Sequence, residues 1–151
     1  MHISAKVDYA MRALVELAVS PVPLVRTEHL AEIQGIPASF LERILGELRR
    51  AGIVASQRGA RGGYRLGRPA ADISVADVFR AVDGPLAEVR GDRPEASSYA
   101  GPAEPLREVW VAVRASLRSV LEEVSVEQVA RNQLPDAVLS LTRAPEAWVR
   151  R

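Results

Sequence analysis

The chain of 151 residues is 48% hydrophobic and has a formal net charge of +1, values that fit one globular domain with an accessory element. It contains no cysteine, which excludes disulfides, thiolate zinc sites, cysteine-ligated iron–sulfur clusters and thiol redox sensing. No apolar run is long enough to cross a bilayer, and the N-terminus lacks the apolar core of a signal peptide. We therefore expect a cytoplasmic protein with no membrane partner.

The small net charge hides an uneven distribution. Residues 1–70 hold ten Lys and Arg against six Asp and Glu, a net +4, whereas residues 71–151 hold ten against thirteen, a net −3. Between residues 43 and 68, seven arginines face only Glu47. A surface that binds phosphates carries such a local excess of positive charge. The alternative is a charged face that contacts only solvent.

The N-terminal part of the chain predicts two helices. Apolar residues recur at three- and four-residue spacing over Ala5–Val19, which predicts an amphipathic helix that ends before Pro21. Thr27 is expected to cap a short helix over Glu28–Gln34, and Gly35 to end it in the left-handed conformation. The side chains expected to face inward on this second helix are Leu30, Ala31 and Ile33.

A third helix and a hairpin follow. The helix is expected to begin after Pro37 and to run to about Ala51, and after it come two strand-like runs, Ile53–Gln57 and Tyr64–Leu66. The segment between the runs carries three glycines and two arginines, which suits a tight hairpin tip. Two short helices across a glycine turn, followed by a hairpin, predict a winged helix-turn-helix. The third helix has one apolar face, made of Leu41, Ile44, Leu45 and Leu48.

The second half of the chain differs in character. Ser74 and Asp77 have the spacing of a capping box that opens a helix through Val82, and Gly84 closes it. Its expected apolar face is Val75, Val78, Phe79 and Val82. Residues 88–104 are rich in turn formers and contain little to bury, so we expect a long mobile loop.

A longer helix is expected to start at Pro105. Its apolar residues repeat at a mean of about 3.5 residues, which is the spacing of paired helices and predicts a dimer seam. After this helix, Ser125 and Gln128 have the spacing of a second capping box for a short helix to Asn132, and the tail beyond Pro145 is expected to fray. The residues of the predicted seam are Leu106, Val109, Trp110, Val113, Leu117, Val120, Leu121 and Val124.

The expected fold is therefore mainly α with a small β-hairpin wing. We divide it into a winged helix-turn-helix over residues 1–86, a loop over 87–104, a dimerisation helix with a short C-terminal helix over 105–144, and a tail over 145–151.

Several of these segments also carry a family pattern. They are Ser4–Lys6, Tyr9–Leu14, Gln34–Ile36, Leu41–Leu45, Leu48–Val54, Arg58–Leu66, Ile73–Val78 and Asp83–Leu86. In these segments the chain resembles the Rrf2 family of IscR- and NsrR-type bacterial regulators, closely over residues 1–86 and in outline over 106–129. The resemblance implies a homodimeric transcription factor that binds a partly palindromic operator.

The chain departs from that family in two places. Many members hold an iron–sulfur cluster on three cysteines in the loop before the long helix, but residues 89–104 contain none. Asp8, a ligand in some members, binds nothing durable alone, so the resemblance implies a member without a cluster or other cofactor. Pro37 stands where a capping Ser or Thr is common, so the start of the recognition helix is expected to differ.

The residues expected to meet DNA lie on the third helix and the hairpin. Ser39, Phe40 and Arg43 are candidates for base edges or nearby phosphates, although Phe40 also suits core packing and Arg43 an ion pair with Glu47. In the hairpin, Arg58 and Arg61 suit phosphates or a narrow minor groove, with solvated surface arginines as the alternative, while Tyr64 and Arg65 are expected to brace the wing and touch the DNA backbone.

Four further residues have weaker assignments. Ser4 and Tyr9 suit hydroxyl bonds to phosphate, and Tyr9 also suits packing under the recognition helix. The only histidines, His2 and His29, are too few for a metal site and are expected at the surface. Trp110 suits the core of the dimer seam or the wall of an effector pocket.

The sequence therefore predicts a sequence-specific DNA-binding regulator, a repressor that acts as a homodimer. The alternative is a protein-interaction module built on a winged-helix scaffold. Catalysis is unsupported, because no nucleophile lies near a recognisable base and no loop cradles a phosphate. The operator, the regulated genes and any small-molecule or protein effector are left open.

Overall fold

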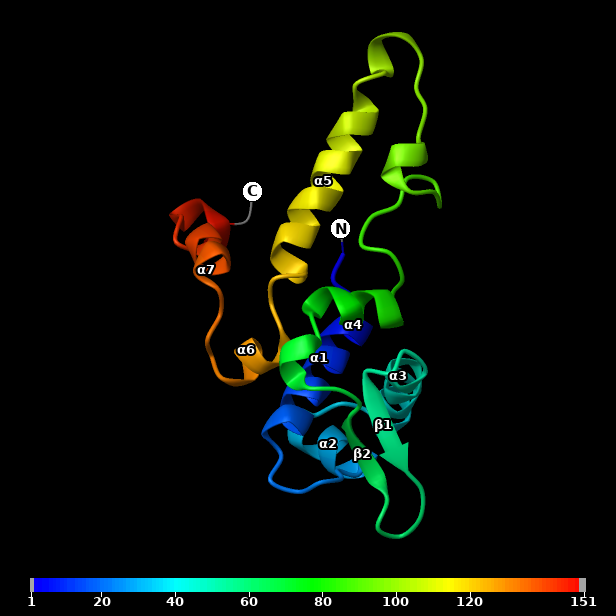
Figure 1. Ribbon diagram of the computed structural model, residues 1–151, viewed down its shortest axis with the longest axis vertical. Helices are drawn as coiled ribbons and strands as arrows, with labels where there is room; N and C mark the ends of the chain where they lie inside the picture. The colour runs from blue at the N-terminus through cyan, green and yellow to red at the C-terminus, as the bar shows by residue number, and fades with distance from the viewer. Residues whose placement is uncertain (1, 150–151) are drawn as a thin grey trace.

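Residues 2–149 are described by a computed structural model that is mostly helical and contains one small hairpin (Figure 1). Helix α5 extends away from the rest of the domain, and the hairpin lies at the opposite end of the molecule. The elements of the described chain are α1 (Ala5–Val19), α2 (Thr27–Gln34), α3 (Ala38–Arg50), β1 (Val54–Gln57), β2 (Gly63–Leu66), α4 (Val75–Val82), α5 (Leu106–Leu121), α6 (Val126–Ala130) and α7 (Asp136–Thr142), with 3-10 turns at Ala70–Asp72, Pro94–Ala96, Gly101–Ala103 and Pro145–Trp148.

Helix α1 is the element against which α2, α3, α4, α6 and β2 pack. The predicted bounds are confirmed, and Ser4 caps the helix by accepting a hydrogen bond from the backbone N–H of Val7 at 3.2 Å. Ala10 and Ala13 are completely buried. Their small side chains let neighbouring elements approach the α1 backbone closely. The buried face of α1 is Val7, Ala10, Ala13, Leu14 and Leu17.

Helix α2 begins one residue earlier than expected. Thr27 is its first helical residue and Arg26 takes the N-cap position without a side-chain hydrogen bond, so the assignment of Thr27 as the cap is wrong. Ile33 is also misassigned, because it is 50% exposed. At 3.6 residues per turn it lies about 110° from the centre of the buried face that Leu30 and Ala31 define. Gly35 ends the helix at φ 62°, as predicted.

Helix α3 packs against α1, α2 and α4. It starts at Ala38, and Pro37 occupies the N-cap position without a side-chain hydrogen bond. Its first turn is therefore not held by a hydroxyl cap. The four side chains predicted to face inward, Leu41, Ile44, Leu45 and Leu48, are all buried.

The hairpin pairs β1 with β2 in antiparallel register, with Val54 opposite Leu66 and Gln57 opposite Gly63. A third segment, not predicted from sequence, joins its edge. The backbone N–H of Val25 donates to the Tyr64 carbonyl at 2.9 Å, and the Tyr64 N–H donates to the Val25 carbonyl at 2.7 Å. The hairpin is thus fixed to the chain just before α2.

The segment expected to be a long loop contains two 3-10 turns and two buried residues. Helix α4 has the predicted capping box, in which Ser74 and Asp77 each accept a backbone N–H bond at 3.0 Å. After it, Pro94 and Ser97 are buried, contrary to the expectation that this segment contains little to bury. The turn Pro94–Ala96 packs on α5, since a proline ring is apolar surface as well as a turn former.

The chain after α5 returns to the core. Val124, expected on the dimer seam, lies beyond the end of α5 and is buried. Its carbonyl accepts a hydrogen bond from Val75 N at 2.8 Å, and Val126 N donates to the Ile73 carbonyl at 2.9 Å. Helix α6 then packs against α1. The predicted domain division placed α6 in a separate part of the chain, residues 105–144. Because α6 packs on the first domain, that division does not apply to α6.

The C-terminal region adds an unpredicted helix, α7, which follows Pro135 and packs with the turn Pro145–Trp148. Beyond Ala144 the chain forms a 3-10 turn over Pro145–Trp148, and residues 150 and 151 of the predicted tail lie outside the described part. Within residues 2–149, no helix has the length and apolar character needed to span a membrane.

The hairpin tip leads to a prediction about Gly62. A Cβ atom there would lie 2.2 Å from the Gln57 carbonyl oxygen and 2.9 Å from the Gly59 oxygen, so Gly62→Ala must shift the backbone. We expect the free energy of unfolding to fall by about 1–3 kcal/mol, measured by urea denaturation. Gly46→Ala is the control, because a Cβ there meets nothing within 4 Å and α3 should gain roughly 0.5–1 kcal/mol. Equal urea midpoints for parent and Gly62→Ala would contradict this tip geometry.

Candidate nucleic-acid interface

Helix α3 and the hairpin carry a run of exposed arginines, which we name the basic face. Six of the seven arginines between residues 43 and 68 are exposed, and the seventh, Arg68, is half-buried at the base of the hairpin. A cleft of about 350 Å³ runs between the start of α2, α3 and the hairpin, and Arg26, Arg49 and Arg58 are among its lining residues. Glu28 and Glu42 line it as well, so the positive charge that suits a polyanion comes mainly from the exposed arginines around the cleft.

The start of α3 presents Ser39 and Arg43 to solvent. Phe40 is half-buried, and its ring packs edge-on against Tyr9 with centroids 5.7 Å apart. The Arg12 guanidinium lies 5.3 Å from the Tyr9 ring centroid. These contacts support the packing alternative for both aromatic rings.

The ion pair considered for Arg43 is not formed. Glu47 is instead paired with Lys6 at 2.9 Å, and Arg43 has no ion-pair partner within residues 2–149. The Arg43 side chain is exposed on the outer face of α3. It is therefore available to an external anion.

The hairpin arginines extend from a tip held by backbone contacts. Arg58, Arg61 and Arg65 are exposed, whereas Tyr64 is half-buried and braces the hairpin through its two backbone bonds to Val25. Ser4 lies apart from the tip. Its oxygen accepts the α1 capping bond, which leaves its O–H free to donate.

Two residues that sequence reasoning missed hold this face together. Arg26 donates from Nη2 to the carbonyl of Ala60 at the hairpin tip, at 3.0 Å. Arg49 donates from Nη1 to Ser56 Oγ on β1, at 3.2 Å. No sequence signal marks the Arg26 contact, because its partner is 34 residues away. Arg49 belongs to the basic run, which could have identified it.

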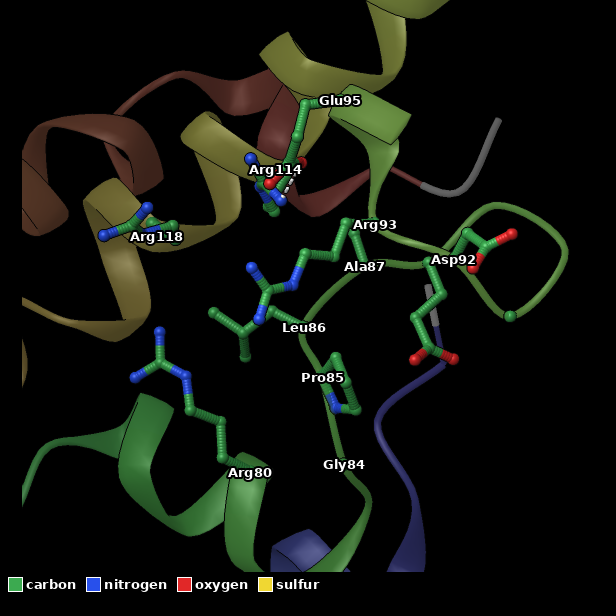
Figure 2. Close-up of a pocket in the computed structure, with 12 residues that line it drawn as sticks. Arg80, Gly84, Pro85, Leu86, Ala87, Asp92, Arg93, Glu95, Arg114 and Arg118 are labelled. Carbon is green, nitrogen blue, oxygen red and sulfur yellow. Dashed lines mark hydrogen bonds and ion pairs between the residues drawn. The ribbon is translucent and has the colours of Figure 1, made fainter. Parts of the chain in front are cut away.

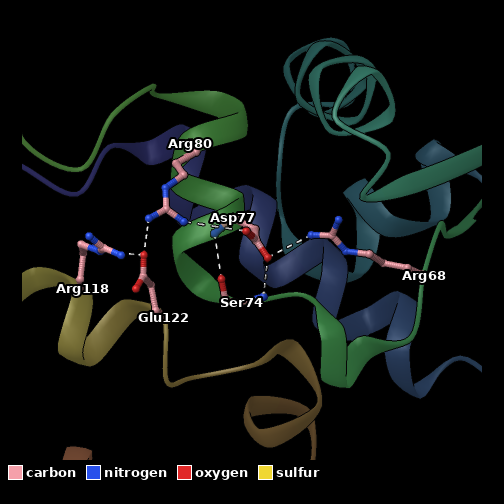
Figure 3. Close-up of polar contacts among 6 residues, drawn as sticks. All are labelled: Arg68, Ser74, Asp77, Arg80, Arg118 and Glu122. Carbon is pink, nitrogen blue, oxygen red and sulfur yellow. Dashed lines mark hydrogen bonds and ion pairs between the residues drawn. The ribbon is translucent and has the colours of Figure 1, made fainter.

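A polar path connects the base of the hairpin to α5 (Figure 3). Arg68 pairs with Asp77 at 3.0 Å, and Arg80 lies 3.9 Å from the other oxygen of the same carboxylate. Arg80 also pairs with Glu122, which accepts from Arg118 Nε at 3.0 Å. The capping box of α4 is thus part of a chain of charges that ends on α5.

Two carboxylates in this region have depressed pKa values. Hydrogen bonds from Arg80 and then Arg118 lower the pKa of Glu122. A backbone hydrogen bond, followed by one from Arg114, lowers the pKa of Glu95. Both carboxylates are therefore held in the charged form by their partners.

The residues of the loop do not fit an iron–sulfur cluster. The whole sequence lacks cysteine, so no thiolate exists to hold iron. In the described part of the chain, no group of three or more His, Asp or Glu side chains is placed to bind a metal ion. The loop therefore has no cysteine ligands with which to hold an iron–sulfur cluster.

Comparison with known proteins identifies the family. The model of the Rrf2 family, described as an iron-dependent transcriptional regulator, matches residues 3–132. The chain belongs to the Rrf2 family. A Mycobacterium tuberculosis H37Rv protein named "Putative HTH-type transcriptional regulator" is 50% identical over 146 residues, covering 93% of this chain and 88% of its own. CymR of Bacillus subtilis is 33% identical over 134 residues, covering 86% and 90%.

Solved Rrf2 structures share the fold. CymR of B. subtilis, titled the global cysteine regulator of that organism, superposes with a TM-score of 0.73 at 30% identity, covering 87% of this chain and 98% of its own. IscR of T. potens gives a TM-score of 0.65 at 30% identity, covering 100% and 93%. These matches confirm the winged-helix fold of a DNA-binding transcriptional regulator. The family is not enzymatic, which agrees with the prediction.

The polar path gives a prediction about pH. Because the pKa of Glu122 is lowered in the native state, its contribution to stability is present above the unfolded-state pKa and is lost as pH falls through the native value. We expect Arg80→Gln to raise the pKa of Glu122 toward its ordinary value, measured by NMR titration of the carboxyl carbon. Arg131→Gln, which removes only the partner of Glu127, should leave it unchanged. An unaltered Glu122 titration in Arg80→Gln would show that this contact does not form.

Proposed function

We propose that this Rrf2 protein is a sequence-specific repressor that binds a partly palindromic operator as a homodimer. The observation that carries the proposal is the basic face, on which the exposed arginines of α3 and the hairpin form one surface. Phosphate neutralisation by such a surface supplies much of the affinity of DNA-binding proteins. A dimer that occupies promoter DNA blocks transcription sterically, so repression is the proposed sense.

In this proposal the exposed start of α3 enters the major groove. Ser39 and Arg43 meet base edges or adjacent phosphates, since the N-terminal part of a recognition helix reads bases. Phe40 and Tyr9 position the helix through their ring contact. Ser4 donates its O–H to a phosphate near the start of α1.

The hairpin acts as the wing. Arg58 and Arg61 meet phosphates or the adjacent minor groove, because a guanidinium suits both. Tyr64 braces the wing and Arg65 meets the DNA backbone. Arg26 positions the tip through the Ala60 carbonyl, which couples the placement of the wing to the start of α2.

The dimer forms through what we name the α5 strip: Leu106, Val109, Trp110 and Val113. These side chains are 36% to 47% exposed and lie along one side of the helix, and an apolar face of this kind is covered in a stable protein. A two-fold axis would place the same strip on both partners. Leu117, Val120 and Leu121 are half-buried against their own chain and form the edge of this surface.

The wing assignment predicts a salt effect. Arg58→Ala and Arg61→Ala should weaken binding to specific and random duplexes alike, and each should reduce the slope of log affinity against log salt by about one unit. Fluorescence anisotropy over a salt series measures this. Arg143→Ala, at the end of α7, is the control and should bind like the parent. Unchanged slopes for both variants would contradict the wing assignment. A parent protein whose affinity for DNA does not depend on salt would favour a protein-interaction module instead.

The α5 strip predicts the oligomeric state. Val113→Glu would bury an unpaired charge in the dimer, at a cost of roughly 3–5 kcal/mol, so the variant should sediment as a monomer while the parent sediments as a dimer. Ala115→Glu is the matched control, because Ala115 is exposed and turned about 200° around the helix from Val113. A parent that is monomeric at micromolar concentration would refute the model of two operator half-sites.

A further inference from the structure

A cavity of about 690 Å³ lies between α4, residues 84–95 and α5. We name it the arginine cavity, because Arg80, Arg93, Arg114 and Arg118 all line it. They come from three separate parts of the fold: one from α4, one from the segment before α5, and two from α5. Figure 2 shows the four side chains around the space, with Pro85 and Leu86 between them. The cavity is distinct from the basic face that we assign to DNA.

The charges of these arginines are only partly balanced within the chain. Arg114 pairs with Glu95 at 2.5 Å. Arg80 and Arg118 share the carboxylate of Glu122, and Arg80 also lies 3.9 Å from Asp77. Arg93 forms no ion pair within residues 2–149, and its charge acts on Glu95 only at longer range. Three of the four guanidinium groups thus pair with the carboxylates of Glu95, Glu122 and Asp77, and Arg93 is the one without an ion-pair partner in the described residues.

The acidic residues of the cavity define its polarity. Glu88 and Asp92 also line it, and neither forms an ion pair in the described part of the chain. In Figure 2, Asp92 lies on the opposite side of Leu86 from Arg80 and Arg118, while the Arg93 side chain extends toward these two arginines. The cavity therefore has a cationic side made by the arginines.

The four positive charges of the arginine cavity lie around one space, and their mutual repulsion opposes this arrangement. Guanidinium groups repel one another, and solvated surface arginines lower this repulsion by spreading apart. Here the fold holds four of them around one space, next to the buried side chain of Leu86. Arg80, Arg93 and Arg118 are exposed and Arg114 is half-buried, so water screens the repulsion in part and leaves the guanidinium groups accessible to an external anion. An anion in the cavity would offset the repulsion.

We propose that the arginine cavity binds a small organic molecule with at least two anionic groups, carboxylates or phosphates. Arginine pairs with both groups through two parallel N–H bonds. Arg93, which lacks an ion-pair partner, is the principal contact, and Arg118 and Arg80 exchange Glu122 for the ligand. The volume of about 690 Å³ is within the range of small-molecule sites.

An anion bound in the arginine cavity would affect the position of the wing through the polar path. When Arg80 turns from Glu122 toward the ligand, its contact with Asp77 changes, and Asp77 holds Arg68 at the base of the hairpin. This regulatory consequence rests on the proposed DNA-binding function, whereas ligand binding itself does not. The anion would thereby control the position of the wing.

The experiment is isothermal titration of the full chain with pyrophosphate and with citrate, at an ionic strength held constant with sodium chloride. We expect saturable binding of at least one probe, weakened about tenfold or more by Arg93→Gln and by Arg118→Gln. Arg61→Gln is the control, because it removes an equal charge from the wing, and it should leave the affinity unchanged. Circular dichroism confirms that each variant is folded.

Two results would overturn the proposal. One is that neither probe binds the parent saturably. The other is that Arg93→Gln binds like the parent while Arg61→Gln is weakened, which would place the anion on the wing. DNA anisotropy on the same samples separates the two proposals. Anion binding without DNA binding would refute only the DNA-binding function, whereas DNA binding without anion binding would refute only the arginine cavity.

Discussion

The packing of five elements on α1 is the constraint on which the rest of the structure depends. Because Ala10 and Ala13 are completely buried, the neighbouring elements lie close to the α1 backbone, and larger side chains there would push them outward. The orientation of α3 and the base of the hairpin are both fixed by contact with this helix. The core therefore sets the position of α3 and of the hairpin base, and the bonds from Arg26 and Arg49 then tie the hairpin to its neighbours.

Local features of the sequence predicted the helices well. The spacing of Leu41, Ile44, Leu45 and Leu48 placed the buried face of α3, and Ser74 with Asp77 marked the start of α4, because periodicity and capping act within a few residues. The failures were non-local. The pairing of Val25 with Tyr64 and the bond from Arg26 to Ala60 join segments far apart in sequence, and no spacing rule reports such contacts.

The same contrast between local features and non-local contacts applies to the candidate site. The glycine-rich hairpin pattern and the local excess of charge made the hairpin arginines candidates, since both signals are close in sequence. Whether an aromatic residue is free or packed depends on what faces it, so Phe40 could be assigned only when Tyr9 was seen beside it. The arginine cavity was beyond prediction for this reason too, because its cations come from α4, α5 and the segment between them. Each is an unremarkable surface residue in the sequence.

The return of α6 to the core has a consequence for how the protein is made. Val126 is completely buried, and its helix packs on the first helix of the chain. During synthesis, the N-terminal domain cannot close its core until the chain beyond residue 126 has left the ribosome, and contacts of such long sequence separation slow folding. By then α5 has already emerged. A nascent chain therefore presents α5 before its core can close, so folding of the first domain depends on the segment that follows α5.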